Sequence, residues 1–264
     1  DQARTGMTPT VIVVGSEKGG TGKSTTSMHL VVAYLRSGKR VASIDLDARQ
    51  GTLSRYLQNR AEVGEKRGLK LPMPRHLRLA PEDAGQDDEL FAEALRQTYG
   101  SADVVVVDTP GADNELSRAA HSWADILITP INDSFLDLDV LANVQQADQI
   151  VLKPSHYSEA VFEAKKRRAL RGQGVMDWIV MRNRLSSLDA RNKRRIEALL
   201  TELSRRIGFR TIAGLGERVI YRELFPQGLT LGDLRDTGVE GTGFTMSHIA
   251  ARQELRDLVR SIGV

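Results

Sequence analysis

The sequence predicts a single-domain α/β protein with a mostly parallel, twisted β-sheet and helices on both faces. Short, continuously apolar runs rich in β-branched residues alternate with helical patterns along the chain. Continuous apolarity is typical of strands that are buried on both faces, as strands are in a parallel sheet. With 264 residues, 41% of them hydrophobic, the chain can bury one substantial core and does not require a second. We place strands at residues 11–15, 41–46, 104–108, 126–131 and 178–183.

The composition excludes several kinds of site. There is no cysteine, so the chain holds no disulfide, thiolate zinc site, cysteine-ligated iron–sulfur cluster or cysteine nucleophile. No apolar run approaches the roughly 18 residues that cross a bilayer, and we expect a cytoplasmic protein. The polar residues 1–9 are expected to be an expression tag or a disordered start, and residues 10–264 to form the one domain.

The first two strands frame a βαβ unit. Between them, KSTTSMHLVVAYLRSGK has apolar residues at helical spacing, and the pattern stops at Gly38. A right-handed crossover then places this helix across one face of the sheet, with the ligand-binding loops at the carboxyl ends of the strands. Residues 59–102 are less regular, with LKLPMPRHLRLAPED expected to be extended or loop and DDELFAEALRQTYG expected to be a helix. We expect this segment to elaborate the same domain.

The segment GGTGKS follows an apolar strand and opens a helix. Glycines allow a loop to bring backbone N–H groups close to phosphates at a helix N-terminus. Lys23 is then placed to reach the β- and γ-phosphates, and the Ser24 hydroxyl to bind Mg²⁺. The ordinary pattern G-x-x-x-x-G-K-[ST] is not met, because Glu17 stands at its first glycine.

A second lysine, Lys18, directly precedes the glycines, and EKGGTGKST resembles the deviant phosphate loop of the ParA/MinD family of ATPases. The resemblance implies a P-loop NTPase fold of the ParA/MinD type, with ATP and Mg²⁺ as cofactors. It implies that Lys23 binds the nucleotide of its own chain. It also implies an ATP-bound homodimer in which Lys18 contacts the nucleotide of the partner chain. By the same resemblance, both lysines are expected to be catalytic residues. The nucleotide contacts that it implies are Lys18, Gly19, Gly20, Thr21, Gly22, Lys23, Ser24 and Thr25.

Carboxylates and an amide follow three other predicted strands. Asp45 and Asp47 lie two residues apart, on the same side of an extended chain. By resemblance to the family, Asp47 orients the attacking water, and Asp45 supports the Mg²⁺ shell or the loop. Asp108 ends a buried strand and is expected to bind Mg²⁺ through water, with Gly111 following the γ-phosphate. Asn183 resembles the residue that reads adenine; capping or turn formation is the alternative for all of these polar residues.

Basic residues are concentrated in one part of the chain. Residues 163–222 contain 16 lysines and arginines against 6 acidic residues. A predicted helix there places Ile196, Leu199, Leu200, Leu203 and Ile207 on one face. The opposite face of this helix carries arginines, and KKRR at 165–168 and Arg222 add further positive charge. This pattern predicts non-specific DNA binding. The alternative is a charged face that is only exposed to solvent. The predicted DNA contacts are Arg191, Arg194, Arg195, Arg205, Arg206 and Arg218.

The stretch HIAARQELRDLVRSIGV at the C-terminus is also amphipathic. Its apolar face carries Ala251, Leu255, Leu258, Val259 and Ile262, while its polar face mixes arginines with acidic residues. It contains no Phe or Trp. We therefore expect this helix to pack on the domain, and we expect no membrane insertion.

Longer stretches, including TPINDSFLDLDVL and MDWIVMRNRLSSLDARNKRR, resemble the MipZ branch of this family, whose members position the division plane. The resemblance implies a nucleoid-associated switch whose monomer meets ParB, and whose ATP-bound dimer binds DNA non-specifically and inhibits FtsZ assembly. Slow hydrolysis resets it. The alternatives are a ParA-type ATPase that moves ParB-bound DNA, and a metabolic P-loop enzyme that needs no dimer.

Overall fold

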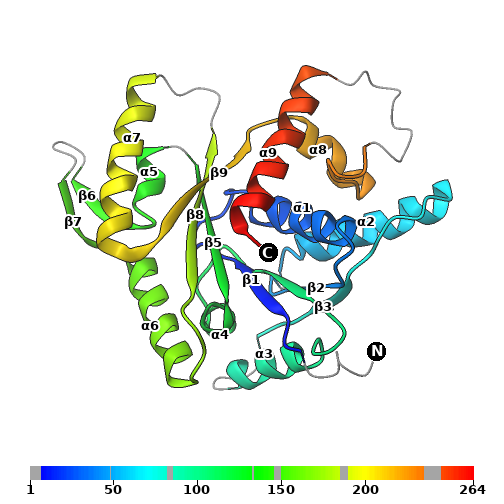
Figure 1. The fold of residues 1–264 in the computed structure, drawn as a ribbon, viewed down its shortest axis with the longest axis horizontal. Coiled ribbons are helices and arrows are strands. Elements are labelled where there is room, and N and C mark those ends of the chain that lie inside the picture. Colours follow the sequence, from blue (N-terminus) through cyan, green and yellow to red (C-terminus); the bar gives the residue numbers. More distant parts are fainter. Residues whose placement is uncertain are drawn as a thin grey trace.

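The computed structural model describes residues 7–47, 49–81, 86–132, 134–145, 150–184, 190–234 and 245–264. Seven strands form one sheet in the order β3-β2-β4-β1-β5-β8-β9, and neighbouring strands pair in parallel. The fold class and all five predicted strands are confirmed (Figure 1). The strands of this sheet are β1 Thr10–Val14, β2 Val41–Asp45, β3 Arg75–Arg78, β4 Val104–Asp108, β5 Ile126–Asn132, β8 Asp177–Arg184 and β9 Arg210–Gly216.

Helices cover both faces of the sheet. In β4, Val105 and Val107 face one core with α3, α4, α6 and α7, while Val104 and Val106 face the other core with α1 and α9. Successive valines of β4 point to opposite cores, and both cores are apolar. The strand therefore carries a continuous run of valines and not an alternation of apolar and polar residues. The helices are α1 Lys23–Arg36, α2 Thr52–Arg67, α3 Asp87–Arg96, α4 Glu115–Trp123, α5 Phe135–Leu138, α6 His156–Leu170, α7 Ala190–Leu203, α8 Ile220–Leu224 and α9 Met246–Ile262.

Residues 59–102 form the end of α2, the edge strand β3 and helix α3. Helix α2 ends at Gly68, whose left-handed backbone (φ 63°) allows the chain to turn away from the helix. A separate antiparallel hairpin, β6 Ala142–Gln145 with β7 Ile150–Pro154, follows α5. Strand β3 lies in the stretch that is expected to be extended or loop, whereas the sequence does not predict β9 or this hairpin.

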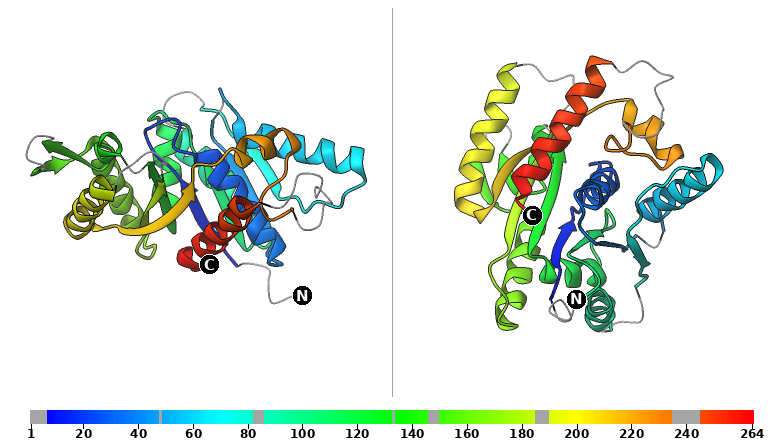
Figure 2. Two further views of the ribbon diagram at one scale, coloured as in Figure 1. Left: turned by 90° about the horizontal axis from the view of Figure 1, so that it is seen from above. Right: turned by 45° about the vertical axis from the view of Figure 1, so that its right-hand side comes forward.

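The C-terminal helix α9 packs on the sheet, as predicted. Ala251, Leu255, Leu258 and Ile262 are buried in the core that includes α1. Helices α7 and α9 lie on opposite sides of β9 (Figures 1 and 2). The predicted basic helix ends as an α-helix at Leu203 and continues as a π-helical turn, Ser204–Gly208, which carries Arg205 and Arg206.

The sheet register brings the predicted site together. Val14 at the end of β1 is level with Asp108 at the end of β4, and Asp108 is level with Asp45 at the end of β2. The loop after β1 leads into α1, so the phosphate-loop segment and both carboxylates lie at the same edge. In doubly wound sheets, ligands bind at this carboxyl edge.

Candidate nucleotide site

The loop between β1 and α1 has the backbone of a phosphate site. Gly20 (φ 73°) and Gly22 (φ 78°) adopt left-handed conformations that residues with a Cβ rarely adopt. Gly22 is the N-cap of α1 and has no side chain to cap the helix, so the first N–H groups of α1 remain available to a ligand. Such N–H groups and the helix dipole favour an anion here.

The two lysines of this loop have different environments. Lys23 is only 8% exposed, and its Nζ donates to the carbonyl oxygen of Lys18 at 2.6 Å. Burial lowers the pKa of Lys23, against the charges of Asp108 and Asp47, which raise it. The Lys18 side chain is 41% exposed and forms an ion pair with the buried Asp137 of α5. Lys23 therefore lies inside the loop, and Lys18 lies at the surface.

The buried Asp108 and the half-buried Ser24 form a hydrogen-bonded pair of possible oxygen ligands. Ser24 Oγ donates to Asp108 Oδ2 at 2.7 Å, and Ser27 Oγ donates to Asp108 Oδ1 at 3.0 Å. Burial raises the pKa of Asp108 to about 7, with the charge of Asp45 adding to the effect and the serine hydrogen bonds and Lys23 opposing it. Mg²⁺ prefers oxygen ligands such as a hydroxyl and a carboxylate, and its charge would favour the ionised form of Asp108. The Ser24 and Asp108 oxygens therefore fit Mg²⁺. Ser27 was not among the predicted residues.

Asp45 holds the loop that carries Asp47. The fully buried Asp45 carboxylate accepts hydrogen bonds from Asp47 N at 2.9 Å and from Ser54 N and Oγ at 2.9 and 2.7 Å. These contacts support its predicted role in holding the loop, and its predicted role in the Mg²⁺ shell stays a prediction. Asp47 Oδ1 accepts from Gln50 N at 2.9 Å, within the turn that precedes α2.

The segment after β4 lies against the phosphate loop. Thr109 Oγ1 donates to the carbonyl oxygen of Val14 at 2.9 Å. At Gly111, an added Cβ would lie 3.2 Å from both the Cα and the N of Gly19. This close backbone approach favours glycine and places Gly111 beside the phosphate loop. Its role at the γ-phosphate stays a prediction.

Asn183 lies at a pocket of about 430 Å³ that continues from the phosphate loop. Its Nδ2 donates to Thr21 O at 2.9 Å, and its Oδ1 accepts from Leu215 N at 3.1 Å. The residues that line this pocket are Gly20, Thr21, Gly22, Thr25, Thr26, Asn132, Asn183, Leu215, Gly216, Glu217, Arg218, Tyr221 and Arg222. The side-chain amide thus ties the phosphate loop to β9, and the predicted contact of Asn183 with the base stays a prediction.

The arginines of α7 and the turn after it form an exposed face. The five predicted apolar residues of this helix are buried, so the helical face was predicted correctly. The exposed arginines are Arg191, Arg194, Arg195, Arg205 and Arg206. Arg195 lies 5.9 Å from the centre of the Phe135 ring, and Arg206 forms an ion pair with Glu202 at 3.3 Å.

Other basic residues do not join this face. Arg218 is one of the residues lining the pocket beside the phosphate loop, where it donates to Glu254 Oε1 at 2.7 Å and Ser247 Oγ at 3.0 Å, both on α9. Arg168, of the KKRR segment, is 5% exposed and pairs with Asp125 at 2.6 Å. The structure thus separates Arg218 from the α7 arginines and gives Arg168 a structural role.

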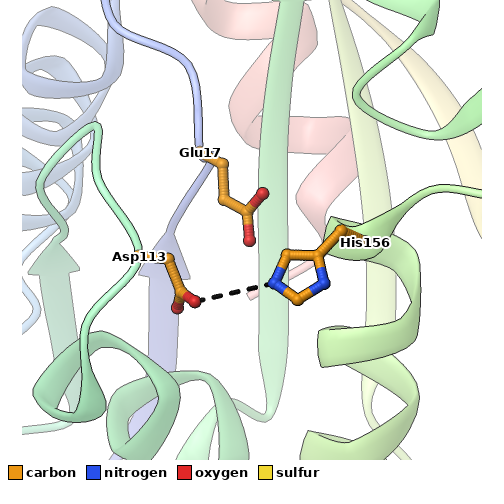
Figure 3. A group of neighbouring side chains, drawn as sticks. All are labelled: Glu17, Asp113 and His156. Atoms are coloured by element: carbon orange, nitrogen blue, oxygen red, sulfur yellow. Dashed lines mark ion pairs between the residues drawn. The ribbon is translucent and has the colours of Figure 1, made fainter.

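Three possible metal ligands meet next to the phosphate loop: Glu17, Asp113 and His156 (Figure 3). They come from the loop after β1, the segment before α4 and the start of α6, and each offers a ligand atom within 4.8 Å of the others. Arg118 already forms an ion pair with Asp113 and lowers its pKa. Because this arginine supplies the positive charge, we assign no metal to the group.

None of the described helices combines the length and the hydrophobicity needed to cross a membrane.

Comparison with known proteins gives a family match over nearly the whole chain. The family model described as ATPase MipZ matches residues 10–264. A maintenance of carboxysome distribution protein A from Gloeobacter kilaueensis is 33% identical over 67% of this chain and 72% of its own length. The chromosome partitioning protein ParA of Caulobacter vibrioides is 28% identical over 66% of this chain and 80% of its own. The chromosome-partitioning ATPase Soj of Thermus thermophilus is 32% identical over 50% of this chain, and the match spans 59% of Soj.

Solved structures share the fold at lower identity. The MinD cell division protein of Aquifex aeolicus has a TM-score of 0.58 and 18% identity, covering 96% of each chain. An ATP complex of McdA from Cyanothece has the same TM-score and identity, covering 95% of this chain and 98% of its own.

Proposed function

This chain belongs to the MipZ family of ATPases, and from that premise we propose that it is an ATP-operated dimerisation switch that regulates the position of cell division. It is an ATPase of the ParA/MinD kind. In the proposal, ATP drives formation of a dimer that binds DNA non-specifically and inhibits FtsZ assembly, and slow hydrolysis restores the monomer. The observation that carries the proposal is the pair of lysines in one loop, one buried and one exposed.

The buried residues of the loop are suited to bind the chain's own nucleotide. The N–H groups at the start of α1 and the Lys23 ammonium face the place where phosphates bind in such loops. Ser24 and Asp108 are the residues that would hold Mg²⁺, which neutralises phosphate charge when bound. Asp47, in the adjoining turn, is the residue that we propose to orient water, and Asn183 the residue that contacts the base.

Lys18 supports the dimer in this proposal. The Lys18 side chain is partly exposed, and its ammonium pairs with the buried carboxylate of Asp137. To reach the phosphates of a second chain, Lys18 must either leave Asp137 or approach together with it. ATP binding and dimer formation then become one coupled equilibrium, because a ligand that binds the dimer better shifts the population toward it.

The exposed arginines of α7 support DNA binding. Lysine and arginine contacts to phosphates supply affinity without sequence preference, and that affinity falls with salt. A dimer presents two such faces, and two linked sites bind a long polymer more tightly than one. ParB and FtsZ are proposed partners on the basis of family membership.

The test is FtsZ polymer sedimentation with the Asp47→Ala variant, first with ATP and then with ADP. Loss of polymer with ATP alone is the expected result. An unchanged polymer yield with both nucleotides would contradict division control and favour a ParA-type partitioning ATPase, as in the Caulobacter vibrioides relative. ATP-dependent turnover without a dimer would instead favour a metabolic P-loop enzyme.

A further inference from the structure

The last residue before the phosphate loop, Gly15, is held by contacts from three directions. Its N–H donates to Ile128 O of β5 at 2.9 Å. Its carbonyl oxygen accepts from the hydroxyl of Tyr157 of α6 at 2.9 Å. On its third side lies His121 of α4, so close that a Cβ added at Gly15 would be 2.5 Å from His121 Nε2. The start of the phosphate loop is thus fixed by side chains far away in the sequence.

These side chains form a buried network that the proposed mechanism does not use. Tyr157 is 3% exposed and His121 is 8% exposed. The Tyr157 hydroxyl is 3.0 Å from His121 Nε2 and 3.1 Å from Thr129 Oγ1, which in turn accepts from Trp178 Nε1 at 3.0 Å. Burial raises the pKa of Tyr157, so its hydroxyl keeps its single proton.

A count of hydrogens shows competition for that proton. His121 Nδ1 is 2.6 Å from the carbonyl oxygen of Ser117, which can only accept, so Nδ1 carries hydrogen. Burial lowers the pKa of His121, which leaves Nε2 of the neutral ring as an acceptor. Thr129 has a hydroxyl proton of its own, and because its oxygen already accepts from Trp178 Nε1, it can donate that proton to the Tyr157 oxygen. In this arrangement the Tyr157 proton has two acceptors, the Gly15 carbonyl and His121 Nε2, and it can serve only one of them fully.

From this geometry we infer that Tyr157 is a positioning residue of the phosphate loop, and that His121 modulates it by competing for its proton. The inference rests on the proposed nucleotide site. Helix α4 follows the segment that contains Gly111, so a shift of α4 changes the distance from His121 to Tyr157 and with it the hold on Gly15. Tyr157 acts through the loop backbone and is not itself a catalytic residue.

The experiment compares Tyr157→Phe with Tyr34→Phe. Tyr34 is a matched control because it is 1% exposed, lies in α1, and its hydroxyl has no partner among the described residues. MgATP affinity is measured by calorimetry, and amide exchange of residues 15–22 is measured without nucleotide. We expect Tyr157→Phe to bind MgATP roughly fivefold more weakly, as loss of one buried hydrogen bond allows, and to exchange faster in the loop. We expect Tyr34→Phe to match the wild type.

Equal affinity and equal exchange in Tyr157→Phe and the wild type would overturn the inference. So would equal changes in both phenylalanine variants, because they would indicate a general effect on packing. If the wild type itself does not bind MgATP, the proposed nucleotide site fails, and the exchange measurement still decides the positioning role.

A second variant tests the competition. In His121→Gln, the side-chain amide can donate to the Tyr157 oxygen, which frees the Tyr157 proton for Gly15. We expect affinity above that of the wild type, and no effect of His121→Gln when Tyr157 is already Phe. Additive effects of the two substitutions would show that His121 acts independently of Tyr157.

Discussion

At the scale of single residues, the phosphate loop assigns different environments to two chemically identical side chains. Lys18→Ala removes the exposed ammonium and leaves Lys23, Ser24 and the loop backbone in place. We expect this variant to bind ATP but to remain a monomer, because only the partner's phosphates lose a ligand. Equilibrium sedimentation with ATP and Mg²⁺ measures the outcome.

Lys166→Ala is the control for that measurement, because Lys166 is also exposed and pairs with a single carboxylate, that of Glu163. It should form the ATP-dependent dimer normally. A Lys18→Ala protein that dimerises as well as this control would contradict the role of Lys18 across the interface.

A second prediction at the residue scale concerns His29, which is fully buried on α1. Its Nδ1 contacts Thr25 O at 2.8 Å, and burial lowers its pKa to about 4. His29 takes up a proton near pH 6.5 in the unfolded chain but only near pH 4 in the folded chain. The free energy of unfolding therefore keeps its full value above pH 6.5 and falls as the pH drops from 6.5 to 4. The loss attributable to His29 is about 3 kcal/mol.

Urea unfolding of the wild type and His29→Gln at pH 7 and pH 4.5 measures this effect. The variant should lose less stability between the two pH values than the wild type, because it lacks the group that titrates. An identical loss in the two proteins would show that other groups, such as His76, carry the pH dependence.

At the scale of elements, the strands that form the site were predictable because both faces are buried and their sequences are continuously apolar. Edge strand β3 reads RHLR and has no fully buried residue, so no apolar run signals it. The phosphate loop, Asp47 and Asp108 lie in local motifs. The contacts of Ser27 and Tyr157 were not predictable, because they join residues 81 and 142 positions apart, which only the packed fold brings together.

Helix α7 carries the element-scale prediction. Arg194 and Arg205 are exposed, so their replacement by alanine removes two positive charges from the proposed DNA face without opening the core. We expect weaker non-specific DNA binding and unchanged ATP affinity. The logarithm of the DNA-binding constant falls linearly with the logarithm of the salt concentration. We expect this slope to become shallower by about 0.9 for each DNA phosphate that the variant no longer neutralises. Fluorescence anisotropy with labelled duplex DNA at several salt concentrations gives both the DNA affinity and this slope.

The matched control replaces Arg96 of α3 and Arg260 of α9, which removes the same charge from other exposed helices. If both double variants lose DNA affinity equally, net charge and not the α7 face determines binding, and α7 is only a solvated face.

At the scale of the whole molecule, the proposal requires that nucleotide hydrolysis control assembly, and Asp47 is the residue through which this can be tested. Asp47→Ala removes the hydrogen bond from Gln50 N to Asp47 Oδ1. It keeps the contacts of the buried Asp45 to the backbone N–H of residue 47 and to Ser54, so these should hold the turn before α2. Without a group to orient water, we expect turnover to fall at least ~100-fold while ATP still binds. The ATP-bound dimer should therefore accumulate and remain on DNA, since two α7 faces bind together.

Turnover, dimer mass and retention on immobilised DNA measure the three parts of this prediction in the same preparation. Asp257→Ala, an exposed carboxylate of α9, is the control and should behave as the wild type. Normal turnover in Asp47→Ala would remove its proposed role in hydrolysis. A trapped dimer that does not stay on DNA would separate dimerisation from DNA binding, and would leave the α7 arginines without a function in the switch.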